Sequence, residues 1–215
     1  MNVLLKHELK YYIKNTKQAI YIYSYYISII LLIPFSEKLV GHEIQELAVI
    51  ALWVALASAI GIGATNLFAR DQDEGRLEYY QLLPGSLEGI VAAKWLAYLI
   101  FTLIPLWAAI PVAGLLFDLS GPAMTHLAIG LTAGATALSS IAALAAVLTT
   151  GIEKAGAVLS LVILPLSIPV MIFGAGYCRE VSVLWQPNLA FMLGFSVLML
   201  PIMCLAGAYS IRASN

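Results

Sequence analysis

The sequence predicts an all-α integral membrane protein with six membrane-spanning helices. Of its 215 residues, 61% are apolar and only 11% are charged, whereas soluble domains are about 45–50% apolar and 25% charged. The mean hydropathy is +0.92. The net charge of −1 provides no basic surface for phosphates, so we expect no nucleic-acid partner. The first residues lack an apolar run followed by a cleavage site, and we expect no signal peptide.

Six apolar stretches are long enough to span a bilayer, which takes about 20 residues of helix. Helices are expected because lipid offers no hydrogen-bond partner to a free backbone group. The predicted spans are 19–35, 47–68, 95–117, 123–150, 155–176 and 189–211. No internal repeat or linker separates them, so residues 1–215 are predicted to form one domain, with 1–18 as an interfacial amphipathic helix.

The lysines and arginines orient these spans. Nine of the eleven precede the first span, follow even-numbered spans or end the sixth: Lys6, Lys10, Lys14, Lys17, Arg70, Arg76, Lys94, Lys154 and Arg212. Only Lys38 and Arg179 lie on the other side. Because cytoplasmic loops are enriched in these residues, both termini and residues 69–94 are predicted to be cytoplasmic.

Small residues and prolines mark how the helices pack. Ala51, Ala55, Ala59 and Gly63 form one stripe, and Gly130 and Gly134 form a GxxxG motif. Such stripes let helices approach closely, either within one bundle or in a dimer. Prolines in the third and fifth spans predict kinks, at Pro105, Pro111, Pro165 and Pro169.

No Asp, Glu, Lys or Arg lies inside a predicted span. Ion-coupled transporters keep such groups at membrane depth. The chain also has no Gly-Lys dipeptide, and therefore no GxxxxGK[ST] nucleotide-binding loop. We therefore expect that this chain is not an enzyme, and that any energy it uses comes from another chain.

Residues 69–94 form the longest polar interval between two spans and are the candidate coupling segment. We expect a helix over 72–83, a turn at Pro84, and Ser86 as the N-cap of the next helix. Arg70 and Glu74 have the spacing of an ion pair. Lys94 is expected to extend its amine toward the membrane surface, with Trp95 at the interface.

The residues predicted to couple this segment to an ATPase are Arg70, Asp71, Asp73, Glu74, Gly75, Leu77, Glu78, Leu83 and Pro84. A solvated loop without a partner is the alternative. A calcium loop fits poorly, because counting from Asp71 the glycine is fifth and the twelfth residue is Leu82. His126 could ligate haem or a metal, but a lone histidine at a helix start is more often interfacial, so we expect no metal site. The roles of His126 and Cys178 stay open.

The sequence resembles the CcmB family of permease subunits. The resemblance rests on Phe68-Ala-Arg70-Asp71, then Gly75, Leu77-Glu78, Leu83-Pro84 and Lys94. A second run is Leu164-Pro165, Ile168-Pro169 and Ile172-Phe173-Gly174. It implies an ABC-2-like permease bundle in the bacterial inner membrane, acting in cytochrome c maturation.

The resemblance further implies a set of partners. These are a CcmA-like ATPase, CcmC- and CcmD-like membrane subunits and a CcmE-like haem chaperone, with two copies of the permease. ATP hydrolysis would drive haem export or release of the chaperone, and haem would be present in the complex rather than firmly bound by this chain. Export of a lipid, polysaccharide or drug, and a non-transporting scaffold, remain alternatives.

Overall fold

A computed structural model describes residues 2–14, 20, 24–31, 44–82, 86–150, 155–179 and 186–213. These residues form helices joined by turns, with no strand among them. The helices are α1 (Asn2–Lys14), α3 (Ile44–Ala64), α4 (Ala69–Asp73), α5 (Arg76–Leu82), α6 (Leu87–Leu116), α7 (Gly121–Leu148), α8 (Ala155–Arg179) and α9 (Pro187–Ala213). Residues 24–31 are also helical.

Five helices of the described chain are long and apolar enough to span a membrane. The candidate spans within them begin at Ala48, Leu87, Gly121, Leu161 and Pro187, and correspond to the second through sixth predicted spans. Of the first predicted span, the structure describes residues 20 and 24–31, and the rest lies outside the described residues.

Helix α7 lies at the centre of the bundle, in contact with α3, α6, α8 and α9. In the apolar window of α7, 78% of the residues are buried within the protein, against 22% for α9. This difference follows from composition, because α7 is rich in alanine and glycine and neighbouring backbones can approach it closely. Helix α9 instead presents most of its apolar surface outward.

The small-residue motifs pack inside this bundle. An added Cβ at Gly63 would come 2.8 Å from Cε2 of Tyr98 on α6, and one at Gly130 would come 2.9 Å from Cδ1 of Tyr177 on α8. At Gly134 it would overlap the ring of Trp53 on α3. Of the two alternatives, packing within one bundle and packing in a dimer, these glycines therefore support the first.

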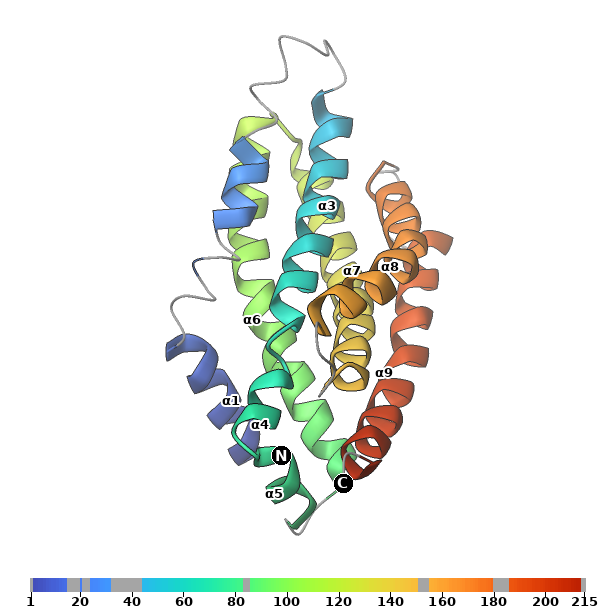
Figure 1. The fold of residues 1–215 in the computed structure, drawn as a ribbon. Coiled ribbons are helices and arrows are strands. Elements are labelled where there is room, and N and C mark those ends of the chain that lie inside the picture. Colours follow the sequence, from blue (N-terminus) through green and yellow to red (C-terminus); the bar gives the residue numbers. More distant parts are fainter. Residues whose placement is uncertain are drawn as a thin grey trace.

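One end of the bundle gathers segments from distant parts of the sequence. Figure 1 shows α1, α4 and α5 at this end, together with the beginning of α6 and the end of α9. The predicted N-cap of α6 is confirmed: the Ser86 hydroxyl accepts a hydrogen bond from the backbone N–H of Gly89, at 3.2 Å. This cap fixes where the segment ends and α6 begins.

Candidate coupling site

The polar segment after α3 folds as two short helices, α4 and α5, rather than the single helix predicted over 72–83. Gly75 separates them, with a φ of +66°. This left-handed conformation favours glycine, because a Cβ there would approach the following carbonyl oxygen. The backbone N–H groups of Glu74 and Gly75 close the turn on the carbonyls of Arg70 and Gln72. Gly75 is therefore the corner of the segment.

Replacing Gly75 with alanine should destabilise this corner by about 1 kcal/mol, through the conformational penalty alone. An added Cβ would meet nothing within 4 Å, so steric overlap contributes nothing. The free energy of unfolding in detergent measures the effect. Gly121→Ala, which is equally open at the start of α7, is the control and should change stability little. Equal effects of the two substitutions would contradict the conformational explanation.

The inner face of α5 attaches the segment to the bundle. Leu77 and Tyr80 are three residues apart, which places them on one face of the helix, and both are buried. The Gln81 side-chain amide donates a hydrogen bond to the backbone carbonyl of Ile211 at 2.7 Å. Because this carbonyl lies near the C-terminal end of α9, where carbonyls lack partners within the helix, α5 is held against both α6 and α9.

The opposite face of α5 is exposed and carries both apolar and acidic groups. Tyr79 is 59% exposed and Leu82 is 82% exposed, and the exposed Glu78 lies beside Leu82 on the same face. Asp73, at the end of α4, is exposed as well. The two carboxylates were predicted from the sequence as coupling residues, but Tyr79 and Leu82 were not. The exposure of Tyr79 and Leu82 could have been predicted from helical spacing, because residues 78, 79 and 82 lie on the face opposite the buried pair at 77 and 80.

Asp71 is not on this exposed face: it is 2% exposed and lies in a buried cluster of charges. Its carboxylate contacts the amine of Lys94 (Oδ2 to Nζ, 2.5 Å) and lies 4.0 Å from the Arg76 guanidinium. Burial raises the pKa of Tyr80, so its hydroxyl keeps the proton that it donates to Oδ1 of Asp71, at 3.4 Å. In this structure Asp71 therefore contacts residues of its own chain and is not available on the surface for a partner.

We expected Lys94 to extend its amine to the membrane surface. Instead, the residue is buried and only 3% exposed. Its amine contacts a second carboxylate, that of Glu8 on α1, at 2.9 Å. Trp95 is also buried rather than interfacial, and its indole N–H donates to the hydroxyl of Ser139 on α7, at 3.0 Å. Two carboxylates offset the cost of burying the amine, which is why Lys94 turns inward. Glu8 was not predicted to be a partner of Lys94, because it lies in another helix.

Arg70 and Glu74 form the predicted i,i+4 ion pair, with 2.7 Å between Nε and Oε1. Their hydrogen bond holds the pKa of Glu74 below its ordinary value. Glu74 also pairs with Arg76 at 2.5 Å, and the Arg70 guanidinium lies 3.7 Å above the ring of Tyr11 on α1. These partly exposed contacts orient α4 more than they stabilise it.

Leu83 and Pro84, the remaining predicted coupling residues, lie outside the described residues.

The four predicted kink prolines lie within helices that continue past them, Pro105 and Pro111 in α6 and Pro165 and Pro169 in α8. The bends themselves stay a prediction.

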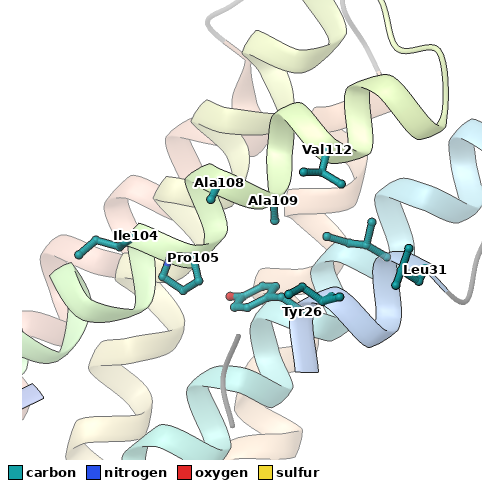
Figure 2. Close-up of a pocket in the computed structure, with 9 residues that line it drawn as sticks. Tyr26, Leu31, Ile104, Pro105, Ala108, Ala109 and Val112 are labelled. Atoms are coloured by element: carbon teal, nitrogen blue, oxygen red, sulfur yellow. The ribbon is translucent and has the colours of Figure 1, made fainter. Parts of the chain in front are cut away.

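Pro105 also lines an apolar pocket of about 310 Å³ between residues 24–31 and α6. In Figure 2 the Tyr26 side chain faces Pro105 across this pocket, and its buried hydroxyl has no hydrogen-bond partner among the described residues.

His126, whose role the sequence left open, is buried inside the bundle. It is 3% exposed, and its ring stacks on that of Tyr177, with 5.1 Å between centroids and 24° between planes. Cys178 is buried beside Gly130. Within the described ranges, no group of three His, Cys, Asp or Glu side chains is placed to hold a metal ion. His126 and Cys178 both lie near the end of the bundle opposite α4 and α5.

Comparison with known proteins assigns the family. The family model described as "CcmB protein" matches residues 1–214. "Heme exporter protein B" of Paracoccus denitrificans is 33% identical over 193 residues, covering 89% of this chain and 88% of the relative. The protein of the same name in Rhodobacter capsulatus is 30% identical with the same coverage, and that of Escherichia coli K12 is 31% identical over 69% of this chain and 68% of its own length. The chain therefore belongs to the CcmB family.

Proposed function

We propose that this chain is the membrane permease subunit of an ABC complex in cytochrome c maturation. It resides in the bacterial cytoplasmic membrane and couples ATP hydrolysis in a partner to haem export or to release of the haem chaperone. The family match over residues 1–214 supports this function. Haem is the cargo of the complex and ATP is bound by the partner.

The single observation that carries the mechanism is the exposed face of α5. Exposed apolar side chains on α9 are explained by lipid, but Tyr79 and Leu82 lie on a short helix that also carries charged groups. An exposed tyrosine is the kind of side chain on which binding energy concentrates, and here Leu82, Asp73 and Glu78 lie around it. We call these four residues the docking face.

The docking face fits a partner with an apolar recess and a basic rim, because opposite charges steer and orient association. In this proposal the partner is the CcmA-like ATPase on the cytoplasmic side. The orientation is supported by Arg70, Arg76, Lys94 and Arg212, which all lie at the end of the bundle that carries α4 and α5. In the proposed topology both termini are cytoplasmic and the chain crosses the membrane six times.

The wider assembly belongs to the same proposal. It contains two copies of this chain with the ATPase, CcmC- and CcmD-like membrane subunits and a CcmE-like chaperone. Family membership supports these partners. A scaffold without transport would bind the ATPase but leave its turnover unchanged, so turnover with and without the permease separates the two functions.

Reversing the docking charges should break the complex with the ATPase. Asp73→Lys with Glu78→Lys should reduce co-purification at least about tenfold, because like charges placed across an interface cost several kcal/mol. Quantitative recovery of the ATPase with the tagged permease measures this. Asp71 is unsuitable for this test because it is buried.

The control for the charge reversal is Asp118→Lys, at the turn between α6 and α7 on the opposite end of the bundle. It makes the same kind of charge change and should leave co-purification intact. Normal ATPase recovery and normal cytochrome c output with the doubly reversed docking face would count against the proposed function. An equal loss in the Asp118 variant would point to net charge rather than to α5.

A further inference from the structure

Helix α1 contacts both segments that flank the docking face. Its Tyr11 ring lies under the Arg70 guanidinium of α4, at 3.7 Å. Its Tyr12 ring stacks on Phe101 of α6, with 4.8 Å between centroids, and lies 6.4 Å from the ring of Tyr98. A helix that only anchored the chain to lipid would not need these paired contacts with α4 and α6.

One buried amine joins α1, α4 and α6. Nζ of Lys94, in the second turn of α6, lies 2.9 Å from Oε1 of Glu8 on α1 and 2.5 Å from Oδ2 of Asp71 on α4. All three side chains are at least nine-tenths buried. Buried charges of this kind have few alternative partners, so a displacement of Asp71 draws Lys94 with it or leaves charges unpaired. We call Glu8, Asp71 and Lys94 the charge hub.

Helix α6 is the main packing partner of α1 in the described part of the chain. Among the helices of the described chain, α1 packs substantially on α6 and not on α3, α7, α8 or α9. Its Lys6 and Lys10 side chains are exposed, as suits a helix at a charged membrane surface. When the beginning of α6 moves, α1 must therefore follow it or give up its tyrosine and carboxylate contacts.

We propose that α1 is a moving part of the coupling unit, and that Glu8 and Lys94 are positioning residues that lock it to α4 and α6. This inference rests on the proposed function, since it takes the partner ATPase as the source of the motion. Displacement of the docking face tilts α4, Asp71 transmits the tilt to Lys94, and the beginning of α6 moves together with α1.

A pair of distance measurements tests the motion directly. Spin labels on Lys10→Cys (α1) and Gln72→Cys (α4), in a background with Cys178 and Cys204 replaced by serine, should keep one distance in nucleotide-free and ATP-trapped complexes. Labels on Lys10→Cys and Gly194→Cys (α9) should change distance between these states. If the α4-to-α9 pair Gln72→Cys and Gly194→Cys changes while Lys10-to-Gly194 does not, α1 stays behind and the inference is overturned.

A matched substitution tests the hub itself. Glu8→Gln keeps the side-chain volume and an acceptor for Lys94 but removes one charge. It should leave ATPase co-purification within about twofold while lowering cytochrome c output about tenfold, as expected for weakening one charge-assisted hydrogen bond. Glu88→Gln makes the same chemical change in the exposed pair with Arg212 at the same end, and should leave both quantities unchanged.

The outcomes separate this inference from the proposed function. Normal output from the Glu8 variant, with its complex intact, overturns the positioning role and leaves the docking proposal standing. Loss of co-purification in the Glu8 variant also overturns it, because the residue would then serve docking. If no labelled pair changes with nucleotide in a complex that hydrolyses ATP, the proposed coupling fails and the role of α1 fails with it. Restored output from Glu8→Asp alongside a defective Glu8→Gln supports the charge as the working feature.

Discussion

Lys94→Met should lower the free energy of unfolding by about 3–5 kcal/mol, the cost typical of breaking a buried ion pair by removing one partner. Without the amine, the carboxylates of Glu8 and Asp71 stay buried near each other, and the nearest compensating charge among the described residues is Arg76, 4.0 Å from Asp71. Chemical unfolding of the purified chain in detergent, followed by circular dichroism, measures the loss.

Two comparison variants interpret the Lys94 result. Arg212→Met removes the exposed pair with Glu88, in which the arginine side chain is 61% exposed, and should cost only about 0–1 kcal/mol. Replacing the whole hub with apolar side chains, Glu8→Leu, Asp71→Leu and Lys94→Met together, should recover most of the stability, since no charge remains unpaired. A Lys94 variant as stable as the Arg212 variant would contradict the buried arrangement.

Gly134→Ala should destabilise the chain by about 3 kcal/mol, the upper part of the range for overpacking a well-packed core. The added Cβ would overlap the ring of Trp53, which is 1% exposed and also lies against Gly174 of α8. A rigid indole between two glycines has no free rotamer to move into, so α3 must separate from α7 or α8. The midpoint of unfolding in detergent reports the change.

Gly194→Ala is the matched control for the Gly134 substitution, because an added Cβ there meets nothing within 4 Å. In the middle of α9 it should be neutral or stabilising by up to about 1 kcal/mol, since alanine is the better helix former. Trp53→Leu should rescue part of the Gly134→Ala defect by removing the clashing ring. If the double variant is no more stable than the sum of the single effects, the contact between these residues is not the cause.

Local features of the segment could be read from the sequence, because they depend on neighbouring residues. The cap at Ser86, the pair of Arg70 with Glu74, and the burial of Leu77 and Tyr80 all follow from spacings of three or four residues. The five described spans follow from length and apolar composition. The glycine motif on α7 was identified, while its partner rings on α3 and α8 depended on how the helices are arranged.

The charge hub could not be read in the same way. Glu8 and Lys94 lie in different helices, and a charge at the membrane boundary is satisfied equally well by water, a lipid head group or another side chain. Asp71 was taken for a surface residue for the same reason. The break at Gly75 was missed because glycine permits a left-handed turn without requiring one. Only the packing of α1 against α6 decides which of these local options is taken.

The separation of Glu8 from Lys94 by 86 residues also orders events during biosynthesis. At synthesis rates of about 5–20 residues per second, roughly 4 to 17 s pass between the two codons. For that interval the acidic side chain of α1 has no Lys94 to pair with. The amino-terminal helix, although it is made first, can therefore dock only after the beginning of α6 has been made.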